Sequence, residues 1–134
     1  EIYKEYGFYK ERLLSITRKG KDGLEEIKKM MESYRNSPPK SISNSPVVMI
    51  KDYLKQMEFD FERHTEQIIS LPKSDVLQFF LKDGSKISVR PSGTEPKIKF
   101  YFSVREDFSD VTRFDETNAH LEKRIDGIIK DLGF

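Results

Sequence analysis

The sequence contains no cysteine, which excludes a disulfide framework and a zinc site built from thiolates. We therefore expect a protein of a reducing compartment and predict a cytoplasmic location. Apolar runs are also short. None approaches the ~20 residues that a membrane-spanning helix needs, and the charged start of the chain is unlike a secretory signal. We expect no membrane partner.

An excess of one charge is also lacking, because 24 Lys and Arg residues face 23 Asp and Glu residues. Nucleic acid is therefore not expected as a partner, and any anion site has to be local. The two histidines, His64 and His120, have no second ligand at a useful spacing, so no metal site is predicted. The acidic segments 60–66 and 105–110 do not form a catalytic carboxylate pair, and no catalytic residue is predicted.

The first third of the chain predicts two helices around a strand. Apolar residues spaced by three and four predict a short helix over residues 2–13, followed by a strand from 13 to 18. A stronger helix starts after Asp22, which forms a capping-box pattern with Glu25 and precedes an apolar face. Pro38-Pro39 should end it. The expected apolar face consists of Leu24, Ile27, Met30, Met31 and Tyr34.

The rest of the chain is rich in strand patterns. A strand is expected over 47–54, a hairpin around Asp83-Gly84 and a half-buried strand over 97–104. A last helix should begin between residues 112 and 117, while 55–74 receive no firm assignment beyond inward-facing Phe59 and Phe61. The order predicts one α+β domain with a mostly antiparallel sheet and helices on one face.

A loop with unusual chemistry interrupts the strand pattern in "VRPSGTEPKIKF", residues 89–100. Arg90 offers a guanidinium fork, Ser92 and Thr94 offer hydroxyls, Gly93 allows a close backbone approach, and Lys97 adds a charge. Such donors suit a phosphate dianion. The glycine and lysine spacing of a Walker loop is absent.

Three interpretations of this loop remain open at the level of residues. It could be an anion site, with Glu95 facing away or paired with a basic neighbour, or a plain structural turn over 90–97 in an interaction domain. The polar face with Lys97, Lys99 and Tyr101 also fits a non-catalytic module that binds single-stranded nucleic acid. A salt titration against an oligonucleotide would separate the last interpretation from the others.

"RPSGTEPKIKFYF" resembles the phosphate-binding loop and following strand of the C-terminal, fourth domain of the α-D-phosphohexomutases, the phosphoglucomutase and phosphomannomutase family. The flanks also look like the phosphoglucomutase and phosphopentomutase branch. The resemblance implies a strand, a helix, four strands and a helix, similar to the TATA-box-binding-protein fold, preceded here by the short N-terminal helix. It implies that residues 1–20 are the tail of the preceding domain with a linker and first strand, and 21–134 the phosphate-binding domain.

The same resemblance implies a function. Arg90, Ser92, Gly93 and Thr94 would hold the non-transferring phosphate of a hexose or pentose phosphate, with Lys97 in support. Gly93 departs from many bacterial relatives, which have Asn there. The phosphoserine, the Mg²⁺ ligands and the sugar-reading loop would belong to the other three domains, and a glucose 1,6-bisphosphate-type intermediate would act as activator. The 134-residue chain alone is expected to be inactive.

Overall fold

The computed structural model describes residues 8–20, 22–106 and 114–132. Two helices and eight strands lie in these ranges. In chain order they are β1 (Phe8–Thr17), α2 (Gly23–Asn36), β2 (Ser41–Ile42), β3 (Ser45–Asp52), β4 (Met57–Asp60), β5 (Thr65–Ile68), β6 (Leu77–Leu81), β7 (Lys86–Pro91), β8 (Lys97–Glu106) and α3 (Phe114–Asp131).

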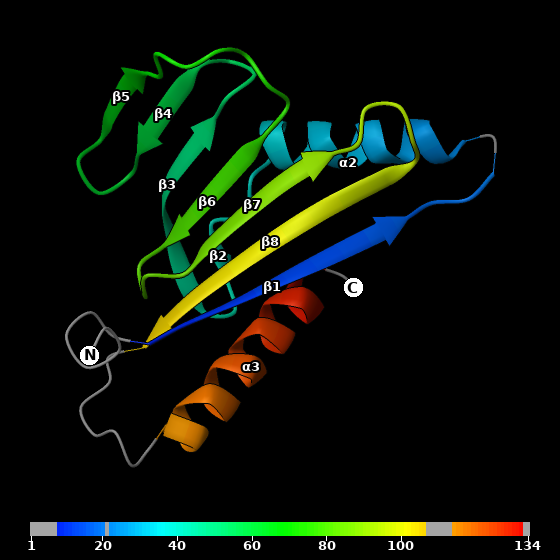
Figure 1. The fold of residues 1–134 in the computed structure, drawn as a ribbon. Helices are drawn as coiled ribbons and strands as arrows, with labels where there is room; N and C mark the ends of the chain where they lie inside the picture. The colour runs from blue at the N-terminus through cyan, green and yellow to red at the C-terminus, as the bar shows by residue number, and fades with distance from the viewer. Residues whose placement is uncertain (1–7, 21, 107–113, 133–134) are drawn as a thin grey trace.

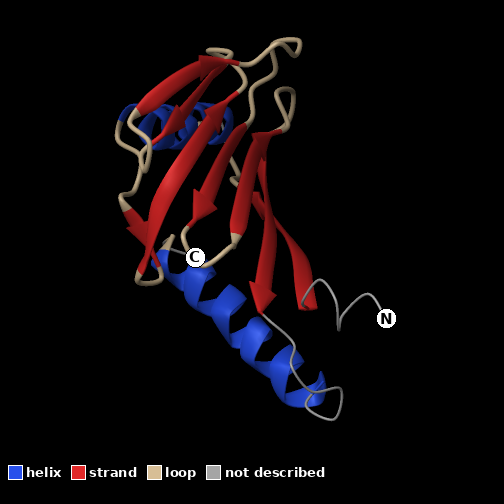
Figure 2. Cartoon of the chain, turned by 90° about the vertical axis from the view of Figure 1, so that its left-hand side faces the viewer, coloured by secondary structure: helices blue, strands red, loops and turns tan. Residues whose placement is uncertain are grey.

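The strands form one antiparallel sheet in the order β1-β8-β7-β6-β3-β4-β5, with β2 paired to β3 (Figure 1). The predicted α+β class with a mostly antiparallel sheet is confirmed. Without β2 and the β4–β5 hairpin at the sheet edge, the order is strand, helix, four strands and helix, as the resemblance implied. Figure 2 shows α3 running along one end of the sheet.

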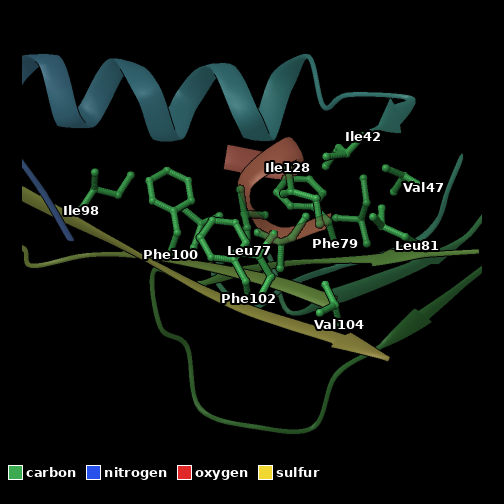
Figure 3. Packing of buried hydrophobic residues seen from close by; sticks show 14 of the residues in the cluster. Ile42, Val47, Leu77, Phe79, Leu81, Ile98, Phe100, Phe102, Val104 and Ile128 are labelled. Carbon is green, nitrogen blue, oxygen red and sulfur yellow. The ribbon is translucent and has the colours of Figure 1, made fainter. Parts of the chain in front are cut away.

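Both helices pack on the same face of the sheet, and the core lies between (Figure 3). In β8, Phe100 and Phe102 are fully buried while the alternate residues Lys99 and Tyr101 are exposed, as expected for a half-buried strand. Truncating Phe100 to alanine would cost about 3–5 kcal/mol of stability. The core residues from the helices are Ile27 and Met31 of α2 and Ile125 and Ile128 of α3.

The N-terminal helix predicted over residues 2–13 is wrong where the structure describes the chain, because residues 8–13 belong to β1. Residues 1–7 lie outside the described ranges. Strand β1 pairs with β8 at every position from Phe8 to Thr17. Leu14 and Ile16 pack against the core from this strand, so long-range pairing outweighs the helical spacing of the apolar residues.

Helix α2 matches its prediction in place but not in two details. It ends at Asn36, before Pro38-Pro39, as expected. Asp22 precedes the helix, but its side chain makes no capping hydrogen bond. Leu24, which was expected on the core face, is 42% exposed.

The hairpin between β6 and β7 is confirmed, but it needs only one left-handed residue. Gly84 has φ of +92° and donates its N–H to the Leu81 carbonyl at 3.0 Å, whereas Asp83 has no positive φ. The two-residue turn with positive φ at both positions, implied by Asp83-Gly84, is therefore not formed. A wider turn with Gly at the left-handed position replaces it.

The unassigned segment 55–74 contains the β4–β5 hairpin. Phe59 packs against the core as expected, but Phe61 is 48% exposed, so its predicted inward position is wrong. The fully exposed β5 carries no apolar alternation that would have marked it as a strand.

The last helix begins at Phe114, within the predicted interval. The side chains of this helix are described from Glu122 to Asp131. Neither of the helices in the described ranges is long and apolar enough to cross a bilayer.

Candidate functional site

The sequence that follows β7 closes into a short loop over residues 92–96. The Ser92 N–H donates to the Lys97 carbonyl at 2.9 Å, and the Lys97 N–H donates to the Glu95 carbonyl at 2.7 Å. Gly93 has φ of +88°, a left-handed conformation that glycine and, less readily, asparagine adopt. Asparagine also tolerates this region, so the Asn that the resemblance implies for many bacterial relatives is compatible with the same loop backbone.

The last residue of this loop, Pro96, contacts the start of α2 and the residue that follows β1. The Arg18 N–H donates to the Pro96 carbonyl at 2.8 Å. A Cβ atom on Gly23 would lie 2.6 Å from the Arg18 carbonyl oxygen and 2.8 Å from the Pro96 Cβ atom. Figure 1 shows the loop beside the N-terminal end of α2. A missing side chain at Gly23 therefore allows a three-way contact that sets the position of the loop.

A hollow of about 600 Å³ lies where the loop meets the face of the sheet opposite α2 and α3, which we call the open face. Of the predicted phosphate-binding residues, Arg90, Ser92 and Lys97 line it together. Gly93 and Thr94 do not line it and are exposed in the loop. The remaining residues that line the hollow are Leu13, Ser15, Pro91, Glu95, Lys99 and Tyr101.

Some of the charged side chains around this hollow form an ion pair, and others do not. Glu95 Oε2 lies 3.2 Å from Lys97 Nζ, so the carboxylate pairs with a basic neighbour as expected from the sequence. Arg90 and Lys99 face each other directly in the register of β7 and β8. Within the described part of the chain, neither of these two cations has an ion-pair partner within 4.0 Å.

Lys99 is the residue of the hollow that sequence reasoning did not assign to phosphate. Strand alternation had placed it beside Tyr101 on the polar face, but only as a possible nucleic-acid contact. The available signal was that Arg90 and Lys99 each alternate with apolar residues on two strands joined by a short loop. This alternation predicts that both side chains lie on the polar face. The strength of this signal depends on the register, which the sequence does not specify.

Two polar clusters elsewhere are structural. Arg35 donates from Nε to Asp52 Oδ2 at 2.9 Å and from a terminal nitrogen to Asp75 at 3.0 Å, which ties α2 to the end of β3 and to the segment before β6. Asp52 is 2% exposed and also accepts two backbone N–H groups, from Leu54 and Lys55. Three hydrogen bonds from within the fold satisfy this buried carboxylate, which is typical of a structural group.

The second cluster joins the β6–β7 turn to α3. Arg124 donates to Asp83 Oδ2 at 2.6 Å and to the hydroxyl of Ser85 at 2.8 Å. Burial raises the pKa of Asp83, but the Ser85 hydrogen bonds and the positive charge of Arg124 outweigh it and hold this pKa below its ordinary value.

No group of three or more His, Asp or Glu side chains among the described residues is arranged to hold a metal ion. His64 is exposed at the turn between β4 and β5, with φ of +55°. His120 lies in the part of α3 whose side chains the structure does not describe. We therefore assign no step to a metal on the described side chains.

The matched sequence defines the class of protein to which this fold and hollow belong. Residues 17–121 match the family described as phosphoglucomutase/phosphomannomutase, C-terminal domain. The chain belongs to this family, and the predicted recognition is confirmed. The described part of the match runs from the end of β1 through the phosphate-loop candidate and β8 into α3.

Individual relatives are phosphoglucomutases of staphylococci. The chain is 38% identical over 120 residues to the phosphoglucomutase of Staphylococcus saprophyticus subsp. saprophyticus, covering 88% of this chain and 21% of the relative. It is 38% identical to that of Staphylococcus aureus strain MRSA252 over 84% of this chain and 20% of the relative. For Staphylococcus haemolyticus the identity is 37%, over 80% and 19%. The chain thus spans about a fifth of the length of these curated relatives.

Proposed function

We propose that this chain is the phosphate-holding C-terminal domain of a phosphosugar mutase, and that its loop holds the phosphate that is not being transferred. The observation that carries the proposal is the hollow in which Arg90, Ser92 and Lys97 meet at the edge of the open sheet face. Family membership supports the same assignment. The boundary between the preceding domain and this one, predicted at residues 20 and 21, remains a proposal.

The hydrogen-bond donors of the hollow can bind a phosphate group, and they do not distinguish which sugar carbon carries it. Arg90 can donate two parallel hydrogen bonds and the Ser92 hydroxyl can donate one, whereas Gly93 and Thr94, which the resemblance also implies as ligands, do not line the hollow. The sugar phosphate reorients between the two phosphoryl-transfer steps, so a different phosphate group occupies this site in each step. A site that contacts only the phosphate can therefore bind the ligand in both orientations. Thr94 could contribute if the loop closed over the ligand.

The reacting groups belong to the rest of such an enzyme. The substrate is a hexose or pentose phosphate, and the bisphosphorylated sugar is the intermediate. The other domains would hold Mg²⁺, which would neutralise charge at the transferring phosphoryl group. This chain contributes orientation. Since substrate and intermediate are charged metabolites, we assign the enzyme to the cytoplasm.

A phosphate titration of the 134-residue chain tests the proposal. We expect amide shifts over residues 92–97 with a Kd of about 1 mM, equivalent to about −4 kcal/mol, because one wall of a cleft binds alone. Glucose 1-phosphate should move the same amides, while sodium chloride at matched ionic strength should not. Shifts confined to the helices would contradict the assignment.

A second measurement addresses catalysis. The same chain should convert glucose 1-phosphate no faster than buffer in a coupled assay, because transfer needs a phosphoryl donor and a metal site. Turnover above buffer would show that the chain contains a complete active site. Oligonucleotide binding that falls with added salt, without a phosphate response of the loop, would instead favour a nucleic-acid module.

A further inference from the structure

Two cations on the open face are arranged in a way that a folded sheet alone does not favour. Arg90 of β7 and Lys99 of β8 are directly opposite each other, both are exposed, and both line the hollow. Like charges at directly opposite positions on antiparallel strands destabilise a sheet. The pair therefore opposes folding unless an anion lies between the two side chains.

Three other lysines of this sheet have carboxylate partners. Lys10 pairs with Glu122 at 3.4 Å, and Lys51 pairs with Glu58 at 3.5 Å. Lys97, the lysine that the sequence assigned to the phosphate, pairs with Glu95 at 3.2 Å. For Lys97 to contact a phosphate fully, it would have to leave this carboxylate or bring it close to the anion, and either change weakens binding.

We propose that Lys99, not Lys97, is the second cation of the phosphate site and that it holds the phosphate together with Arg90. This inference rests on the proposed function. Adjacent strands lie about 4.8 Å apart, so two long side chains from opposite positions can reach one phosphate. The arginine orients the phosphate through its planar fork, and the lysine adds a mobile point charge. Lys97 instead keeps Glu95 away from the anion.

The arrangement predicts opposite effects on stability and on binding. Lys99→Met removes the repulsion in the free protein, so its melting temperature without phosphate should rise by roughly 1–4 °C. The same change should weaken phosphate binding about tenfold or more, because it removes a charge-assisted contact. A lysine with only a structural role would not produce both effects.

The experiment compares three single variants of the 134-residue chain by melting temperature and by titration with inorganic phosphate. Lys99→Met should behave as described above. Lys97→Met should weaken binding less than about threefold. Lys86→Met is the matched control, since Lys86 lies on the same strand and face as Arg90 but outside the phosphate hollow, and it should change binding little.

The outcomes separate this inference from the proposed function. If the unmodified chain shows no phosphate response at the loop, the proposed function fails, and the inference fails with it. If the unmodified chain responds but Lys97→Met or Lys86→Met loses as much affinity as Lys99→Met, only the assignment of Lys99 is overturned. An unchanged or lower melting temperature of Lys99→Met would overturn the repulsion on which the assignment depends.

Discussion

Replacing Gly23 with alanine should loosen the junction that fixes the phosphate loop. The added Cβ would lie 2.6 Å from the Arg18 carbonyl oxygen and 2.8 Å from the Pro96 Cβ atom, which are closer than real Cβ atoms approach. Neither neighbour is the tip of a flexible side chain, so the start of α2 or the loop exit must move. Overpacking of this kind costs about 1–3 kcal/mol.

Gly127→Ala in α3 provides a matched control. Its Cβ would come 3.2 Å from the hydroxyl oxygen of Ser43, a side-chain tip that can rotate away. Alanine gains up to about 1 kcal/mol over glycine inside a helix, so this variant should be neutral or slightly stabilised. Because both glycines lie in helices, part of the propensity gain is common to the two variants. Their difference of about 1–3 kcal/mol then reports the contact at Gly23.

The assay is urea unfolding followed by circular dichroism, with thermal melting as a second measurement. We expect a lower midpoint for Gly23→Ala and an unchanged m-value. The melting temperatures of the two variants should differ by roughly 3–15 °C. Amide shifts at residues 92–97 should also change in Gly23→Ala before any phosphate is added. A Gly23→Ala protein as stable as Gly127→Ala would refute the three-way contact.

Three other variants test the site and its supports. In the full-length mutase that we propose, Arg90→Ala should lower kcat/KM by about tenfold to a hundredfold, more than Lys97→Ala and equally for 1-phospho and 6-phospho sugars, with the fold intact. An effect on melting temperature alone would contradict it. Gly93→Ala should be destabilised by about 1 kcal/mol because of its φ of +88°, whereas Gly93→Asn should fold nearly normally, and equal melting temperatures would argue against loop strain. Asp83→Asn should be less stable than the parent above pH ~3.9, with the difference vanishing as the pH falls through the lowered pKa of Asp83. A difference that persisted in acid would show that charge is not the cause.

The sign of that pH dependence follows from the folded state. The carboxylate form of Asp83 is favoured by Ser85 and Arg124 more than it is disfavoured by burial, so its pKa is lower in the folded chain. The contribution to stability is therefore complete above the unfolded pKa, about 3.9, and is lost as Asp83 becomes protonated below it. Asparagine retains an oxygen that can accept the Ser85 N–H, but its amide nitrogen replaces the Oδ2 acceptor of Arg124, so the variant removes the charge together with that hydrogen bond.

Strand alternation made β8 and its buried face predictable, while the N-terminal segment was misread for a reason that lies in tertiary contacts. On the face of β1 that meets the helices, Lys10 and Arg12 are matched by Glu122 and Asp126 of α3. An apolar pattern does not reveal a face covered partly through ion pairs, so the helical spacing of Ile2, Tyr6, Tyr9 and Leu13 dominated the prediction.

The candidate site was predictable to the extent that it is local. Arg90 and Ser92 lie beside the loop in sequence, and the hollow brings them together. Gly23 could not be found in this way, because its role depends on a contact with Pro96 across the fold. Lys99 was visible only as one position on a polar face, since a local sequence does not show that Lys97 is paired with Glu95.

The geometry divides the phosphate loop into a supporting side and a binding side. Arg18 and Gly23 hold the loop at Pro96 through backbone contacts, whereas Arg90 and Lys99 project from the open face. Because the supporting contacts involve backbone atoms and a missing side chain, changes at the binding side can leave the loop in place. Lys99→Met should have a lower phosphate affinity and a higher melting temperature, whereas Gly23→Ala should have a lower phosphate affinity and a lower melting temperature. This contrast would distinguish the binding side of the loop from its supporting side.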